Sequence, residues 1–157
     1  MQKHPITTIG LRSLETERNK LKNEDRVSVI KAISSARELG DLSENAEYHA
    51  AREQQAFIEG RIKDLDDLIS RADVIDPSII NSSKVMFGAT VILKDLDECL
   101  QKKYQIVGEY EANLELGLIS YTSPLGKSLI GKQKGEVVDN ATPKTTKSWE
   151  ILDILYQ

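Results

Sequence analysis

The sequence predicts an α+β protein in which an antiparallel coiled-coil hairpin precedes a small antiparallel β-sheet domain with one short helix. Apolar residues recur at helical spacing on both sides of one short turn in the first half of the chain. The second half contains five short stretches rich in β-branched and aromatic residues, which is typical of strands. Because the two patterns are segregated along the chain, the α+β class is favoured over alternating helices and strands.

Two apolar stripes predict the helices of the hairpin. The first comprises Leu11, Leu14, Leu21, Val27, Ile30 and Ile33. The second steps by four and three residues through Ala51, Gln55, Ile58, Ile62, Leu65, Ile69 and Ala72, which is the spacing of a coiled-coil seam. Polar and charged residues at 22–26 interrupt the first stripe. We therefore expect the first helix to shift phase or kink there.

A single turn joins the two predicted helices. Gly40 suits the left-handed position just past a helix C-terminus, and Asp41 or Ser43 is expected to cap the next helix. A short connection makes the helices antiparallel neighbours. At a rise of about 1.5 Å per residue, some 28 residues per helix give an arm about 40–45 Å long.

The composition changes after residue 76, which predicts an arm at 1–76, a linker at 77–84 and a second domain at 85–157. Strands are expected at 90–93, 104–107, 118–121, 136–138 and 149–154. The last of these has apolar side chains on both faces, so we expect it to be central. Ser123, Pro124 and Gly131 are the start and stop signals of one short helix.

Composition excludes several classes of function. The chain has 21 Lys and Arg against 25 Asp and Glu, so strong autonomous binding to nucleic acid is not expected. It shows neither a signal-peptide pattern nor the roughly 18 apolar residues of a membrane span, which favours a cytoplasmic protein with no membrane partner. Cys99 is the one cysteine, which excludes an internal disulfide and a multi-cysteine zinc site. We expect a monomer.

The turn between the helices carries two carboxylates, Asp41 and Glu44. Carboxylate oxygens are ligands that Mg²⁺ prefers, but two are too few for a magnesium site of their own. They would reach a metal held in another molecule. A structural alternative fits the same residues: Asp41 at an N-cap with Glu44 three positions later resembles a capping box, and acids near a helix N-terminus are stabilised by its dipole.

A longer stretch around this turn carries a family resemblance. Residues 36–55, with 58–62 and 74–76, resemble the signature of bacterial transcript cleavage factors of the Gre family, of GreA type; the first of these segments reads ARELGDLSENAEYHAAREQQ. Residues 123–132, SPLGKSLIGK, are similar to the C-terminal motif of the same family. The resemblance covers essentially the whole chain.

The resemblance implies a partner and an activity. Family members place an FKBP-like C-terminal domain at the rim of the secondary channel of RNA polymerase, and their coiled coil enters the channel. They are not enzymes themselves but stimulate the endonuclease activity of a backtracked polymerase on the extruded RNA 3′ end. Asp41 and Glu44 match the acidic pair of the family. They would help to hold a second Mg²⁺ shared with the polymerase and to position water, while the isolated protein would bind none.

Four basic residues are weaker candidates for contact with RNA or polymerase. Arg37 and Arg52 lie near the turn, where they would contact extruded RNA or acidic groups of the polymerase. Ion pairs across the hairpin with Glu44, Glu47 or Glu53 are the alternative. Lys127 and Lys132 would pair with acids on the polymerase, and a solvated surface is the alternative for both.

Two departures from the family pattern lie outside the acidic pair. Val27 stands where members often carry proline, and residues 140–147 replace a turn that usually contains paired glycines. Two other functions remain as alternatives. One is a channel-binding relative that inhibits polymerase without promoting cleavage, and the other is an FKBP-type prolyl isomerase or chaperone. The second is disfavoured because two Phe, one Trp and five Tyr supply few aromatics for a proline pocket.

Overall fold

The structure is a computed structural model that describes residues 2–141 and 143–157, and it confirms the α+β class. The chain forms two compact units. One contains Leu11–Ala72, and the other contains Lys3–Gly10 together with Asp73–Gln157. The division into 1–76, 77–84 and 85–157 stays a prediction about domains. Residues 3–10, near the start of the chain, therefore belong to the same unit as the C-terminal half of the chain.

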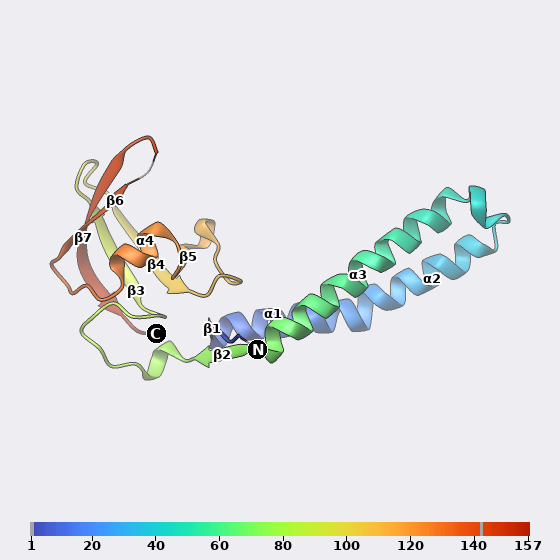
Figure 1. The fold of residues 1–157 in the computed structure, drawn as a ribbon, viewed down its shortest axis with the longest axis horizontal. Coiled ribbons are helices and arrows are strands. Elements are labelled where there is room, and N and C mark those ends of the chain that lie inside the picture. The colour runs from blue at the N-terminus through green and yellow to red at the C-terminus, as the bar shows by residue number, and fades with distance from the viewer. Residues whose placement is uncertain (1, 142) are drawn as a thin grey trace. The chain divides into compact units, whose positions relative to one another are not determined.

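The first unit is a helical hairpin, here called the arm (Figure 1). Helix α1 (Thr8–Lys20) continues through a π-helical turn (Leu21–Asp25) into α2 (Arg26–Arg37), and α3 (Ala46–Ser70) packs against α2. The seam between them is apolar and buried. It contains Leu14, Leu21, Val29, Ile33 and Ala36 from the first helical run and Ala51, Ile58, Ile62, Leu65 and Leu68 from α3.

The predicted phase shift in the first helix occurs. In the predicted stripe after it, Ile33 is buried as expected, but the placement of Val27 and Ile30 in the seam was wrong. Val27 and Ile30 are 45% and 51% exposed, whereas Val29 is buried. Seven residues on from Leu21 a regular helix would present Ser28 to the seam. The π-helical turn accommodates one extra residue, so Val29 takes that place instead.

The second unit contains the five predicted strands and the predicted short helix. The strands are β3 (Thr90–Asp95), β4 (Gln101–Val107), β5 (Leu118–Ser120), β6 (Val137–Ala141) and β7 (Thr146–Leu155), and the helix is α4 (Pro124–Leu129). The order in the sheet is β5-β4-β3-β7-β6, so β7 has a neighbour on each side, as its two apolar faces predicted.

The sheet is mixed rather than purely antiparallel. β3 pairs antiparallel with β4 and β7, and β6 pairs antiparallel with β7, but β5 runs parallel to β4. The connection at 108–117 includes a 3₁₀ turn (Leu114–Leu116) and is longer than the loop of a tight hairpin. It therefore returns the chain in the same direction, which the strand patterns did not indicate.

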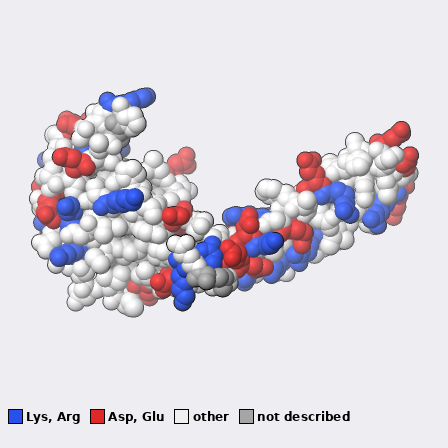
Figure 2. All heavy atoms as spheres, in the orientation of Figure 1, with Lys and Arg blue, Asp and Glu red and all other residues white. Residues whose placement is uncertain are grey.

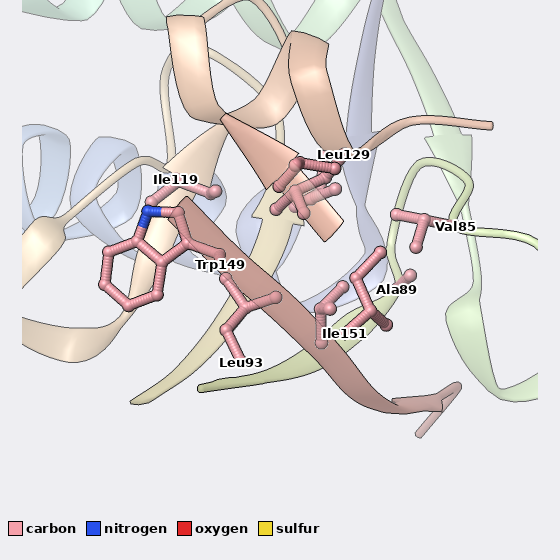
Figure 3. Packing of buried hydrophobic residues seen from close by; sticks show 10 residues of the cluster. Val85, Ala89, Leu93, Ile119, Leu129, Trp149 and Ile151 are labelled. Atoms are coloured by element: carbon pink, nitrogen blue, oxygen red, sulfur yellow. The ribbon is translucent and has the colours of Figure 1, made fainter. Parts of the chain in front are cut away.

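Buried side chains from the strands and α4 form the core of this unit (Figure 3). Leu93, Trp149 and Ile151 pack from the sheet, and Leu129 reaches them from α4. The ring of Trp149 meets that of Tyr104 edge to face, with centroids 6.4 Å apart. The helix and strands are thus joined by one apolar cluster, consistent with the packing of α+β domains.

A second, two-stranded sheet was not expected from the sequence. It pairs β1 (His4–Thr7) with β2 (Ala72–Ile75), and a 3₁₀ turn (Pro77–Ile79) follows β2. Within the two described ranges, no helix is long and apolar enough to span a membrane. Thr142, in the segment 140–147 that departs from the family pattern, lies outside the described residues.

Candidate functional site

The candidate site is the turn at residues 40–45, where the arm reverses direction. α2 ends at Arg37, and Gly40 follows with a φ of 121°, a conformation that favours glycine as predicted. A β-carbon on Gly40 would meet no atom within 4 Å. Glycine is therefore favoured here by the backbone conformation and not by a lack of space. A 3₁₀ turn (Leu42–Glu44) then leads into α3.

Asn45 caps α3, so the expectation that Asp41 or Ser43 would do so was wrong. Its side-chain Oδ1 accepts a hydrogen bond from the Tyr48 backbone N–H at 3.0 Å. Its Nδ2 donates to the Ala36 carbonyl oxygen at 2.6 Å, which ties the end of α2 to the start of α3. Sequence reasoning missed Asn45 although asparagine is among the strongest N-cap residues.

Asp41 caps the 3₁₀ turn instead. Its Oδ1 accepts hydrogen bonds from the backbone N–H and the hydroxyl of Ser43, at 3.0 and 2.9 Å. These two bonds lower the pKa of Asp41 below the usual aspartate range, the backbone bond contributing most. Its carboxylate is therefore anionic and oriented, and Oδ2 has no hydrogen-bond partner among residues 2–141 and 143–157.

Glu44 lies on the same turn and does not complete a capping box. Its side chain is exposed and forms no hydrogen bond or ion pair with any residue that the structure describes. Capping thus accounts for one oxygen of Asp41 and for none of Glu44. The uncommitted carboxylate oxygens remain available to a ligand from outside.

Both acids line one shallow hollow at the end of the arm. Its lining is Leu39, Asp41, Glu44, Asn45, Ala46 and Glu47. Figure 2 shows acidic side chains gathered at this end. Glu47, in the first turn of α3, was not expected there. Within the described part of the chain no three His, Cys, Asp or Glu residues are grouped to hold a metal ion. The donors suit Mg²⁺ only if another molecule supplies further ligands.

Arg37 and Arg52 lie on one side of the arm near this turn and share a second hollow. Its other lining residues are Ile30, Ile33, Ser34 and Gln55. The guanidinium carbon of Arg37 lies 5.9 Å from the ring centroid of Tyr48, within cation–π range. Neither arginine forms an ion pair with Glu44, Glu47 or Glu53 in the described structure, contrary to the alternative from the sequence.

Two other arginines of the arm are paired across the two helices. Arg26 contacts Glu59 at 2.7 Å, and Arg61 contacts Glu17 at 2.6 Å. The guanidinium groups of Arg37 and Arg52 therefore differ from those of Arg26 and Arg61, because they have no carboxylate partner among the described residues.

Lys127 and Lys132 are both exposed and line one hollow of the second unit. Ser128 and Ile130 lie beside them, and Val137, Val138 and Asp139 form the wall on β6. The structure thus brings these two lysines together in one hollow at the edge of the sheet. The exposed apolar side chains of Ile130 and Val137 line the same hollow.

Comparisons with known proteins agree over the whole chain. Residues 4–74 match the family described as "Transcription elongation factor, N-terminal", and residues 80–156 match "Transcription elongation factor, GreA/GreB, C-term". A solved structure of GreA factor homolog 1 (Gfh1) from Thermus thermophilus is 27% identical, with a TM-score of 0.45 and coverage of 98% of this chain and 99% of that one.

Relatives named transcription elongation factor GreA are more similar. The Ruegeria pomeroyi protein is 54% identical over 156 residues, covering 99% of both chains. The Paracoccus denitrificans protein is 53% identical at the same coverage, and the Hyphomonas neptunium protein is 50% identical over the full length of both chains. The chain therefore belongs to the GreA/GreB family of transcription elongation factors.

Proposed function

We propose that this protein binds RNA polymerase and stimulates the polymerase's own endonucleolytic cleavage of the RNA 3′ end in backtracked complexes. Membership of the GreA/GreB family and the names of its relatives support the partner. The observation that carries the proposal is the state of the turn: Asp41 and Glu44 are exposed, close in sequence on a narrow hairpin, and hold uncommitted oxygens.

In this proposal the arm enters the secondary channel and the C-terminal domain docks at its rim. An antiparallel pair of helices is narrow, which suits a confined channel. The protein acts as a monomer in the cytoplasm and catalyses no reaction alone. Asp41 and Glu44 are useful only when the arm delivers them to the active site of the polymerase.

The chemistry at the turn follows from its donors. When bound jointly with the polymerase, a second Mg²⁺ supplies Lewis acidity that lowers the pKa of water for phosphodiester hydrolysis. Asp41 and Glu44 would be its ligands from this chain. The hydrogen bonds from Ser43 hold the Asp41 carboxylate in one orientation and keep it anionic, so no proton must be removed before it binds a cation.

The basic residues would hold RNA and polymerase. The guanidinium groups of Arg37 and Arg52, which have no carboxylate partner in the described structure, flank an apolar hollow that suits an extruded nucleotide with its phosphate and base. Lys127 and Lys132 would pair with carboxylates of the polymerase while Ile130 and Val137 cover apolar surface. Crosslinking of extruded RNA to the arm tests the role of the arginines. The double variant Arg37→Ala with Arg52→Ala should lower the yield of crosslinked RNA and make that yield less dependent on salt concentration.

The decisive experiment adds the protein to stalled, backtracked elongation complexes with Mg²⁺. Wild type should release short 3′ RNA fragments. Asp41→Asn with Glu44→Gln should still fold and compete for the polymerase but lose this release. Glu38→Gln, an exposed acid that does not line the hollow, is the control and should retain it. Cleavage by the double variant would refute the roles of both acids, and inhibition without cleavage by wild type would favour the inhibitory alternative.

A further inference from the structure

The backbone of Ser43, between the two acids of the turn, is held on both sides by side chains. Its N–H donates a hydrogen bond to Asp41 Oδ1 at 3.0 Å. Its carbonyl oxygen lies 3.3 Å from Nε2 of His49. Because a carbonyl oxygen only accepts hydrogen bonds, Nε2 carries the hydrogen and donates it. The peptide groups before and after Ser43 are therefore fixed by Asp41 and by His49.

His49 reaches the turn because of its place in α3. It lies in the first turn of this helix, and helical side chains tilt toward the helix N-terminus. Its ring can therefore contact Ser43, six positions earlier in the chain. Among the residues that the structure describes, no other side chain of α3 forms a hydrogen bond with residues 40–44. His49 thus links the turn to the body of a long helix.

Packing gives the 3₁₀ turn at 42–44 little support. None of its residues is buried, and Leu42 is 37% exposed. The backbone bond from the Asn45 N–H to the Leu42 carbonyl oxygen is long, at 3.4 Å. An exposed segment with few bonds opens locally at a small cost in free energy. The order of this turn therefore depends on individual contacts such as that from His49.

We propose that His49 is a positioning residue that fixes the peptide group between Ser43 and Glu44, and thereby the placement of the Glu44 carboxylate relative to Asp41. Rotation of this peptide group would move the Glu44 side chain, which has no partner of its own among the described residues. Two ligands of one Mg²⁺ must be well placed, because the ion demands near-ideal octahedral geometry. The effect on cleavage rests on the proposed function, whereas the effect on the order of the turn does not.

Two variants of His49 differ in where they place a donor. Glutamine carries its amide nitrogen near the position of Nε2 in histidine, and asparagine carries it near the position of Nδ1. His49→Gln therefore keeps a donor for the Ser43 carbonyl oxygen, and His49→Asn does not. Gln54→Asn, at an exposed position further along α3, makes the same change from glutamine to asparagine and controls for helix propensity.

Backbone order parameters from nuclear magnetic resonance relaxation measure the order of the turn without polymerase. His49→Asn should lower the value for the Glu44 N–H from the range of rigid backbone, about 0.85, toward about 0.6. His49→Gln and Gln54→Asn should leave this value unchanged. An unchanged value in His49→Asn would overturn the proposal, as would an equal fall in either of the other two variants. Thermal melts establish that each variant is folded.

Cleavage in backtracked complexes separates positioning from binding. His49→Asn should lower the rate at saturating protein roughly tenfold, because a misplaced ligand acts inefficiently, while the half-saturating concentration stays near wild type. His49→Gln should restore the rate. A loss confined to affinity would mean that His49 contacts the polymerase and does not position Glu44. If wild type stimulates no cleavage, the proposed function fails, and the order parameters still decide whether His49 holds the turn.

Discussion

The turn at the end of the arm and the turn between β3 and β4 share one local hydrogen-bond pattern, but one aspartate is exposed and the other is buried. Asp41 accepts a hydrogen bond from the backbone N–H of Ser43, and Asp95 accepts one at 2.9 Å from that of Asp97. Asp41 is exposed and uses one oxygen. Asp95 is fully buried and uses both, since its Oδ2 also lies 3.4 Å from the Lys147 ammonium.

The charge state is similar in the two turns although the surroundings differ. For Asp95, burial by itself raises the pKa, but the N–H groups of Asp97 and Glu98 and the charge of Lys147 together lower it below the usual range. For Asp41, the bonds from Ser43 lower the pKa without a cation. The local turn thus helps to keep each aspartate ionised, and the tertiary surroundings decide whether its charge stabilises the fold or faces outward.

The largest expected effect is a difference in RNA cleavage between variants of Asp41 and of Asp76, an aspartate with the same local hydrogen bonds. Asp76 also accepts hydrogen bonds from the backbone N–H and the hydroxyl of a serine two residues later, Ser78. Asp41→Asn should lower RNA cleavage in backtracked complexes by roughly a hundredfold, because the proposed metal ligand from this chain loses its charge. Asp76→Asn should leave cleavage unchanged. Equal loss in both variants would mean that the turn, and not its place on the arm, matters.

The buried turn should show the reverse pattern. Asp95→Asn should lower the melting temperature of the protein by roughly 5 °C or more. The substitution removes the negative charge that pairs with Lys147, and it places an NH₂ donor at a buried position where an oxygen now accepts. Calorimetry measures this change. Asp41→Asn should shift the melting temperature much less, and a larger shift from Asp41 would contradict the division of roles.

The cap of α3 also supports the turn at 40–45. Asn45→Ala removes the bonds to Tyr48 and Ala36 and should destabilise the arm by about 1 kcal/mol. Denaturant unfolding followed by circular dichroism measures this loss. Asn19→Ala, at an exposed position in α1, is the matched control and should be neutral or slightly stabilising.

The smallest effect concerns the titration of Asp41. Its carboxyl carbon, followed by nuclear magnetic resonance, should titrate below the ordinary aspartate pKa of roughly 3.9. Because the folded pKa is the lower one, the stabilisation that ionised Asp41 gives to the turn is complete above the ordinary value and is lost as pH falls through the folded pKa. Ser43→Ala should move the midpoint upward, and Ser78→Ala should affect Asp76 instead. An unmoved midpoint in Ser43→Ala would exclude the serine hydroxyl as a cause.

Patterns within short stretches predicted most elements of the fold. The five strands, α4, the break at Gly40 and the disturbance near residues 22–26 follow from periodicity and from residues with strong conformational preferences. The acidic pair and the four basic residues were also identified from the sequence, and the structure shows which of them share a hollow. Their roles stay predictions.

Local patterns were enough to predict the two helices, the strands and the two carboxylates at a tight turn, because these features depend on neighbours within a few residues. The tertiary structure places Val29 in the seam, pairs β5 parallel to β4 and brings Glu111 into hydrogen-bond contact with Thr7, 104 positions away. It also decided that one oxygen of Asp41 remains without a partner among the described residues. Such outcomes depend on interactions between distant segments, which no local pattern specifies.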